Sequence, residues 1–283
     1  MMLVFNEIKE MQSWCLEFKR QGRKIGLVPT MGYLHEGHLS LVKEAGRQCD
    51  IVVVSIFVNP TQFGPNEDFD SYPRDIESDR QKLAQEKVDA IFAPSAREMY
   101  HEGYNSWVEL KGEITSKLCG ASREGHFRGV TTVVGKLFNI CQPDKAFFGQ
   151  KDAQQAMIIE KMVQELNFPL AIVRVPIVRE ADGLALSSRN VYLDDEQRRQ
   201  ALVLSRSLQK ARQLAENGEH NVARLKQEIR KMIEAAPQAR IDYVEIYAAD
   251  DLGDVEEING RVLIALAVKF GNTRLIDNLI VEV

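Results

Sequence analysis

The chain has few cysteines and keeps them far apart, at Cys15, Cys49, Cys119 and Cys141. No two of them form a C-x-x-C unit, so a zinc knuckle or a redox-active pair is not expected. Scattered cysteines with mostly apolar neighbours are typical of reduced core residues in a cytoplasmic protein.

The chain also lacks a basic tail or any run of cations. Its 283 residues include 36 Lys and Arg against 41 Asp and Glu, which gives a formal charge of −5. Nucleic-acid interfaces need clustered cations, so we expect no nucleic-acid partner. Anionic small molecules stay open as ligands, because a pocket can be locally positive on an acidic protein.

Long apolar runs are missing as well. The longest, DIVVVSIFV and VLIALAV, have the length of strands and are too short to cross a bilayer. The first residues, MMLVFNEIKEMQSW, lack the basic-then-apolar order of a signal peptide. We therefore expect no membrane association and a cytoplasmic location.

Apolar strands alternate with helical segments over the first 177 residues. The strands are continuously apolar, as strands buried on both faces are. The alternation favours an α/β fold with a Rossmann-like, doubly wound parallel sheet. We expect strands over 24–29, 50–58, 88–94, 145–149 and 170–178, and helices over 8–20, 38–48, 76–87, 130–142 and 153–166.

The pattern changes after Val178. A polar loop is predicted over 179–190, followed by two amphipathic helices over 195–217 and 222–236. Three strands then follow without helices between them, over 241–249, 261–270 and 274–283. This order favours a smaller C-terminal α+β domain with an antiparallel sheet. We expect two domains, residues 1–177 and 178–283.

The segment VPTMGYLHEGHLSLV (28–42) places His35 and His38 around Gly37, where a strand turns into a helix. Backbone N–H groups and the helix dipole favour an anion there, and Gly37 would let a phosphate approach the backbone. Histidines three apart share a face of the first helical turn, so both can donate to phosphate oxygens. This is not the zinc motif H-E-x-x-H, since position 39 is leucine. Two ordinary surface histidines are the alternative.

The segment LALSSRN (184–190) offers two hydroxyls, Ser187 and Ser188, and the guanidinium of Arg189 after another strand. These groups suit a polyphosphate. The alternative is that they merely cap the next helix.

The segment FFGQKDAQQ (147–155) also opens a helix after a strand. Gly149 allows close approach, Lys151 is a point charge for phosphate, and Asp152 could reach a ribose hydroxyl or a cation. A plain loop with a helix cap is the alternative.

Amide side chains suit a small polar ligand. Gln62, supported by Asn59, follows a strand in FVNPTQFG, and Gln155 lies one turn beyond Lys151. Because ligands of open α/β sheets bind at the carboxyl ends of the strands, we expect all these segments to form one cleft.

The sequence leaves the roles of three charged residues undecided. Arg128 in GHFRG would face an anion or make a structural ion pair. Asp75 and Asp79 could help to hold Mg²⁺, although a solvated helix face is the favoured interpretation.

As an ordered set, these segments resemble the pantothenate synthetase (pantoate–β-alanine ligase) family. PTMGYLHEGH is similar to the HIGH-type signature that the family shares with nucleotidylyltransferases and class I aminoacyl-tRNA synthetases, and LALSSRN resembles the KMSKS-type signature. FVNPTQF, YPR, GHFRGV, GQKDAQQ and TRLIDN match family blocks in the same order. The resemblance covers essentially the whole chain.

The resemblance implies an enzyme, an AMP-forming carbon–nitrogen ligase of pantothenate and coenzyme A biosynthesis. Pantoate carboxylate would attack the α-phosphorus of Mg·ATP to give pantoyl adenylate and pyrophosphate. The amine of β-alanine would then displace AMP to give pantothenate. The cofactor would be Mg²⁺, the partners ATP, (R)-pantoate and β-alanine, and the assembly a homodimer.

The resemblance also assigns site residues. His38 would be the acid-type catalytic residue. Gln62 would bind pantoate and β-alanine, supported by Asn59, and Gln155 would bind pantoate. Residues 1–177 would bind nucleotide and pantoate, and residues 178–283 would be a lid. The other catalytic groups would be His35, Lys151, Ser187, Ser188 and Arg189. ATP would contact Met31, Gly32, Tyr33, Leu34, His35, Glu36, Gly37, His38, Gly149, Gln150, Lys151, Asp152, Val178, Leu186, Ser187, Ser188 and Arg189.

Two alternatives stay open. Another nucleotidylyltransferase, such as phosphopantetheine or nicotinate mononucleotide adenylyltransferase, would explain His35 and His38 but not Gln62 and Gln155, which suit a compact organic acid. A non-catalytic nucleotide-binding regulatory protein would explain the phosphate-binding loops but would leave the glutamines without a role.

Overall fold

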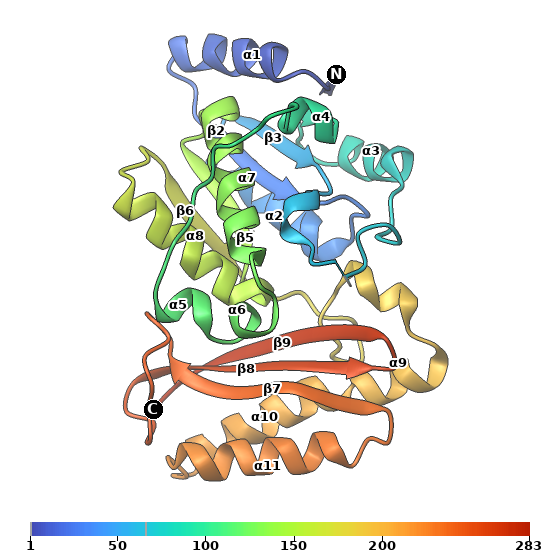
Figure 1. Cartoon of the computed structure of the whole chain (residues 1–283), viewed down its shortest axis with the longest axis vertical. Helices are drawn as coiled ribbons and strands as arrows, with labels where there is room; N and C mark the ends of the chain where they lie inside the picture. The colour runs from blue at the N-terminus through green and yellow to red at the C-terminus, as the bar shows by residue number, and fades with distance from the viewer. Residues whose placement is uncertain (1, 66) are drawn as a thin grey trace. The chain divides into compact units, whose positions relative to one another are not determined.

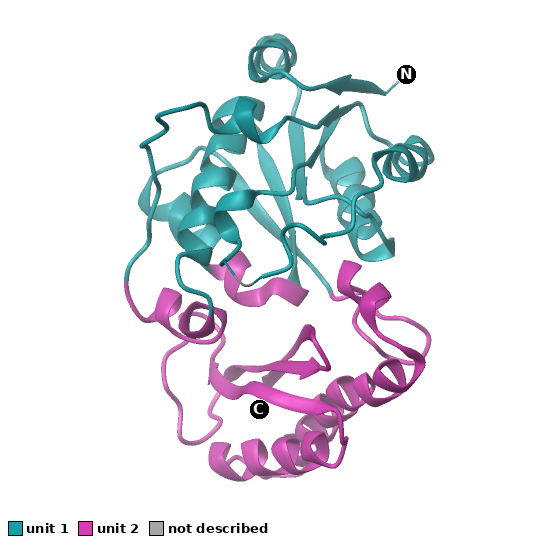
Figure 2. Cartoon of the chain, turned by 45° about the vertical axis from the view of Figure 1, so that its right-hand side comes forward, with its two compact units in different colours: residues 1–111, 123–150, 158–176 teal, residues 112–122, 151–157, 177–283 magenta. Residues whose placement is uncertain are grey.

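The computed structural model describes residues 2–65 and 67–283, which form two compact units (Figure 2). Unit 1 holds the described residues up to Lys111, together with Arg123–Gln150 and Ile158–Pro176. Unit 2 holds Gly112–Ser122, Lys151–Met157 and Ile177–Val283. The chain enters unit 2 for the last time beside the expected domain boundary, but two shorter segments join unit 2 earlier, which chain order does not reveal.

Unit 1 contains a six-stranded parallel sheet, which confirms the expected fold class (Figure 1). The strand order is β1-β4-β3-β2-β5-β6. Helices α1 (Ile8–Arg20) and α7 (His126–Cys141) pack on each other, and α2 (Glu36–Gln48) packs on β2, β3 and β5. The strands are β1 (Leu3–Phe5), β2 (Ile25–Thr30), β3 (Ile51–Ile56), β4 (Ala90–Phe92), β5 (Lys145–Gly149) and β6 (Ala171–Val175), and the other helices touching this unit are α3 (Ile76–Ala84), α4 (Ala96–Met99) and α8 (Ala153–Glu165).

The chain order reverses between β2 and β5. From β2 the chain continues to the neighbouring strand β3, whereas β5 lies on the other side of β2. The register Gly26 to Lys145 and Leu27 to Ala146 brings the last residues, Thr30 and Gly149, to the same sheet edge. In open α/β sheets this switch point is where ligands bind, so the topology exposes the loops after β2 and β5 together.

Unit 2 is built on an antiparallel sheet of β7 (Ala239–Ala248), β8 (Arg261–Phe270) and β9 (Thr273–Glu282). Alternate residues of β8, such as Ile264 and Leu266, pack in one core with Leu208 of α10 (Val203–Glu216) and with Ile229 of α11 (Val222–Glu234). This is the two-residue period of a strand meeting the apolar stripes of two helices. The short helices α5 (Glu113–Ser116) and α6 (Cys119–Ser122) belong to the same unit.

Two local expectations were wrong, one loop has more structure than expected, and strand β1 and the short helices α4, α5 and α6 were not expected. The helix expected over 195–217 is interrupted at Leu202, which separates α9 (Asp195–Ala201) from α10. The helix expected from Val130 begins at His126, because Gly125 takes a left-handed φ of 73° and caps it. The loop expected over 179–190 contains a bridge between Arg179 and Ala185 and the 3₁₀ helix η3 (Ser188–Tyr192). No helix in the described part of the chain is long and apolar enough to span a membrane.

Candidate active site

The loop after β2 and the first residues of α2, 31–38, are together called the histidine loop. Gly32 and Tyr33 take positive φ values of 81° and 50°, which turn the chain sharply after β2. A Cβ on Gly32 would lie 3.0 Å from both Asp79 Oδ2 and Ile56 Cγ2, so the position needs glycine for space as well as for conformation. Gly37 and Glu36 lie in the first turn of α2.

Asp79 of α3 holds the histidine loop. Its Oδ2 and Oδ1 accept the backbone N–H groups of Tyr33 and Leu34 over 2.8 and 2.7 Å, and Lys82 Nζ donates to the Leu34 carbonyl over 2.7 Å. Asp79 is only 1% exposed, so the favoured expectation of a solvated face is wrong for this residue. Burial raises the pKa of its carboxyl, against the opposing effect of the two N–H donors. Asp75, by contrast, caps α3.

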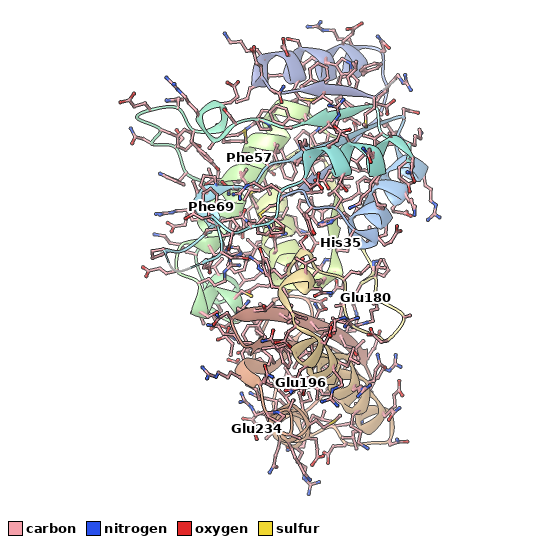
Figure 3. All side chains as sticks on the ribbon, turned by 90° about the vertical axis from the view of Figure 1, so that its right-hand side faces the viewer. His35, Phe57, Phe69, Glu180, Glu196 and Glu234 are labelled. Atoms are coloured by element: carbon pink, nitrogen blue, oxygen red, sulfur yellow. The ribbon has the colours of Figure 1, made fainter. Side chains whose placement is uncertain are left out.

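The two histidines have a defined hydrogen-bond geometry at the start of α2, and Figure 3 labels His35 there. His35 Nδ1 accepts the Gly37 N–H over 3.1 Å, and His38 Nδ1 accepts the His35 N–H over 3.3 Å. The ring centroids lie 4.0 Å apart. An imidazole that accepts at Nδ1 carries its proton on Nε2 when neutral. Both rings therefore present an Nε2–H donor, which suits phosphate oxygens.

Gln62 is tied to the histidine loop. It ends the short helix η1 (Pro60–Gln62), and its Nε2 lies 3.3 Å from Met31 Sδ. Asn59 Nδ2 donates to Gln62 Oε1 over 3.1 Å, while Asn59 Oδ1 accepts from the Tyr100 hydroxyl over 2.8 Å. Asn59 is almost fully buried, so its visible task is to orient the Gln62 amide.

The backbone of Gln62 is fixed by His126 and Gly129 of the GHFRGV block and by Arg123, which lies outside the motifs. His126 Nδ1 donates to the Gln62 carbonyl over 2.8 Å, and Arg123 Nη1 donates to His126 Nε2 over 2.9 Å. Arg123 also makes a two-point ion pair with Glu67, over 2.6 and 2.7 Å. A Cβ on Gly129 would lie 2.7 Å from the Gln62 nitrogen, so only glycine lets α7 approach this closely.

Within unit 2, Lys151 starts the segment that continues into α8. Gly149 and Gln150 precede Lys151 and belong to unit 1. The short 3₁₀ helix η2 (Gln150–Asp152) contains both Gln150 and Lys151. Lys151 Nζ lies 3.7 Å from Asp152 Oδ2. Gln155 lies in α8 and is partly exposed. The neighbouring Gln154 is structural, because it bonds to Ile114, Lys117 and Cys119 of the same unit.

The hairpin arm, residues 178–189, carries the predicted serines and arginine. Leu186 N donates to the Val178 carbonyl over 3.0 Å, which closes the base of a hairpin. Ser187 caps η3 by accepting the Arg189 N–H over 3.2 Å, so the capping alternative is met here as well. Ser188 is buried.

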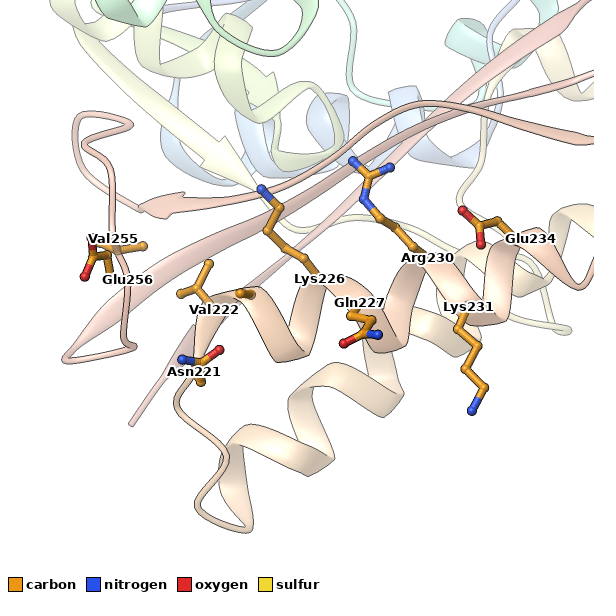
Figure 4. A pocket seen from close by; sticks show the side chains of 10 residues that line it. Asn221, Val222, Lys226, Gln227, Arg230, Lys231, Glu234, Val255 and Glu256 are labelled. Atoms are coloured by element: carbon orange, nitrogen blue, oxygen red, sulfur yellow. The ribbon is translucent and has the colours of Figure 1, made fainter.

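Three other candidate features of the chain do not involve these residues. Arg128 lies over the Trp107 ring at 4.9 Å, which is a cation–π contact. No group of three or more His, Cys, Asp or Glu among the described residues could hold a metal ion. A hollow of about 920 Å³ runs along α11, and no predicted site residue lines it (Figure 4).

A family model described as pantoate-beta-alanine ligase matches residues 3–280. The chain belongs to the pantoate–β-alanine ligase family. The pantothenate synthetase of Syntrophomonas wolfei is 64% identical over 282 residues, covering 100% of both chains, and that of Pelotomaculum thermopropionicum is 61% identical over 279 residues, covering 99% of both.

Solved pantoate–β-alanine ligases share the fold. The pantothenate synthetase from Thermus thermophilus superposes with a TM-score of 0.93 at 44% identity, over 98% of both chains. A pantoate-beta-alanine ligase from Francisella tularensis, complexed with beta-gamma ATP and beta-alanine, gives 0.82 at 37% identity over 99% of this chain and 97% of that one.

Membership of the pantoate–β-alanine ligase family makes the chain an enzyme. The expected class, a ligase of pantothenate biosynthesis that binds ATP, is confirmed. The adenylyltransferase alternative finds no support in these comparisons.

Proposed function

We propose that the chain joins (R)-pantoate to β-alanine in two steps at the edge formed by the histidine loop and Gln62. In the first, a pantoate carboxylate oxygen attacks the α-phosphorus of ATP, and the bond to pyrophosphate breaks. In the second, the β-alanine nitrogen attacks the acyl carbon, the bond to AMP breaks, and the nitrogen loses a proton. The observation that carries this proposal is the contact between Met31 and Gln62, which joins a phosphate-binding loop to an amide suited to an organic acid.

ATP is bound by two sets of donors. In unit 1, the Nε2–H groups of His35 and His38 and the backbone around Gly149 face phosphate. In unit 2, Lys151 and Arg189 supply cations and Ser187 and Ser188 supply hydroxyls. The full set remains Met31–His38, residues 149–152, Val178 and residues 186–189. An in-line displacement needs positioning and charge neutralisation rather than a covalent nucleophile, and these donors supply both.

Pantoate is bound by Gln62 and Gln155, with β-alanine also close to Gln62. The Gln62 Oε1 is already engaged by Asn59, so its Nε2–H₂ is the end directed to substrate. The backbone carbonyl of Gln62 is held by His126, so both the main chain and the side-chain amide of this residue are fixed. Such pre-organisation reduces the entropy lost when substrate binds.

Magnesium enters as part of the substrate, Mg·ATP. Mg²⁺ is commonly held by one or two carboxylates, waters and substrate phosphates. Both Asp79 oxygens accept backbone N–H groups, whereas Asp152 is partly exposed. Asp152 therefore fits a supporting role beside phosphate oxygens, and the ion supplies charge neutralisation there.

The remaining proposals concern the assembly. We assign residues 1–177 to nucleotide and pantoate binding, and 178–283 to a lid that excludes water from the acyl adenylate. We also propose a homodimer, to be checked by light scattering, and a cytoplasmic location, in keeping with four free, buried cysteines.

Isotope exchange between ATP and pyrophosphate tests the function. We expect exchange that requires (R)-pantoate and needs no β-alanine. Exchange that ran equally well without pantoate, or with phosphopantetheine in its place, would overturn the proposal.

Two variants probe the assigned donors in the same assay. His38→Ala and Lys151→Ala should each slow exchange roughly 10²–10³-fold, the usual effect of removing one transition-state donor. His101→Ala and Lys161→Ala, at exposed positions, are the matched controls and should keep near-normal rates. Normal exchange in both site variants would show that the phosphates bind elsewhere.

A further inference from the structure

Strand β9 carries two adjacent polar residues that are almost completely buried. Asp277 is 2% exposed and Asn278 is 3% exposed. Adjacent residues of a strand point to opposite faces of the sheet, so the pair serves two different surroundings. Burying polar groups is costly unless they are hydrogen-bonded, and the partners of each lie in a segment assigned above to ATP.

Asp277 holds the base of the hairpin arm. Arg179 Nη1 and Nη2 bond to its Oδ2 and Oδ1 over 2.7 and 2.9 Å, a two-point pairing that fixes orientation as well as distance. Arg179 Nη1 also donates to the Gly183 carbonyl over 3.1 Å, which ties the hairpin tip to its base. The arm that ends in Ser187–Arg189 is therefore anchored to β9.

Asn278 holds Lys151. Its Nδ2 donates to the Lys151 carbonyl over 2.9 Å, and its backbone N–H donates to Asp277 Oδ1 over 2.8 Å. The same aspartate oxygen thus accepts from Arg179 and from Asn278. Two adjacent positions of β9 therefore link the main chain of Lys151 to the root of the hairpin arm.

We propose that Asp277 and Asn278 are positioning residues of the ligase reaction. Neither reaches the nucleotide. Together they set the spacing between Lys151 and the hairpin arm, so that the ammonium and the Arg189 guanidinium meet one triphosphate at fixed separation. This inference rests on the proposed function, because the proposed function makes ATP the shared ligand of Lys151 and Arg189.

A double-mutant cycle separates positioning from stability. Asn278→Ala should slow pantoate-dependent ATP–pyrophosphate exchange about 10–100-fold, because small misplacements of catalytic groups have effects of this size. In a Lys151→Ala background it should slow exchange less than about twofold, since residues that act as a unit are non-additive. Asn272→Ala, in the exposed turn before β9, is the control and should match the wild type.

A second double-mutant cycle tests Asp277 through its partner Arg179. It also keeps the inference testable if Asn278→Ala fails to fold. Arg179→Lys keeps the charge at a partly exposed position but loses the two-point pairing. It should slow exchange in the wild type and not in Arg189→Ala. Equal slowing in both backgrounds, or none in the wild type, would overturn this inference. Loss of pantoate dependence in the wild type would instead overturn the proposed function.

Discussion

Asp79→Asn replaces one of the two oxygens that hold the histidine loop with an amino group. In the wild type each carboxylate oxygen accepts one backbone N–H, from Tyr33 or Leu34. In the variant the amide oxygen keeps one of these bonds, and the –NH₂ group faces the other N–H. Two donors then point at each other in a site that is 1% exposed.

The cost follows from these contacts. A hydrogen bond to a charged group contributes about 1.5–3 kcal/mol, and a buried donor without an acceptor costs about 1–3 kcal/mol. Removing the buried charge returns part of this, because burial already raises the pKa of the carboxyl and so disfavours its ionised form. A net loss of about 1–3 kcal/mol remains, which corresponds to a Tm fall of roughly 2–12 °C.

Asp79→Asn should also slow catalysis. The two N–H groups belong to the residues that lead directly into His35, so a relaxed turn displaces both imidazoles. We expect pantoate-dependent ATP–pyrophosphate exchange to fall roughly 10²-fold, the penalty for a shift of about 1 Å. Exchange rates are measured well below the lowered Tm, so that the variant stays folded.

Asp75→Asn is the matched control. It makes the same substitution on the same helix, at the N-cap of α3, where asparagine caps as well as aspartate. Its Tm and exchange rate should stay close to those of the wild type. If Asp79→Asn loses stability but exchanges at the normal rate, the histidine loop does not depend on this carboxylate and the reasoning fails.

Three further variants test Gln62 and the residues that hold it. Gly129→Ala should lower the Tm and weaken use of pantoate, because the new Cβ would lie 2.7 Å from the Gln62 nitrogen and push η1 away; an unchanged KM for pantoate would contradict this. Glu67→Gln should cost about 1–3 kcal/mol at pH 7. Burial acts to raise the pKa of Glu67, but the bonds and charge of Arg123 outweigh it and hold the pKa below 4.5, so this stabilisation is present above pH 4.5 and is lost as the pH falls through the folded-state value. The free energies of unfolding of the two proteins, measured with denaturant, should therefore converge as the pH falls well below 4.5, and a difference that stayed constant there would refute the ion-pair argument. Gln62→Ala should raise the KM for pantoate with little change in the KM for ATP, and equal changes in both would remove Gln62 from the acceptor site.

The sequence by itself determined the fold class and five of the six strands of the parallel sheet, without β1, and it nominated the segments that we propose carry the site. These follow from local rules, since buried parallel strands are continuously apolar and a helix that starts directly after a strand offers free N–H groups to an anion. His35, Lys151 and Arg189 could be nominated because each follows a predicted strand, and the family blocks fixed their order. Local rules also limit how precisely the sequence predicts where a helix begins. The start of α7 at His126 depended on a left-handed glycine, which the apolar pattern does not encode.

The tertiary structure alone decided which residues hold the site in place. Asp79 lies more than 40 residues from the turn that it fixes, and Asn278 bonds to a carbonyl 127 positions earlier in the chain. An acidic residue on a charged helix, or an asparagine in an apolar strand, carries no local mark of its partner. The physical reason is that burial and hydrogen-bond pairing are set by which elements come together in space, whereas helix and strand periodicity is set by neighbours along the chain.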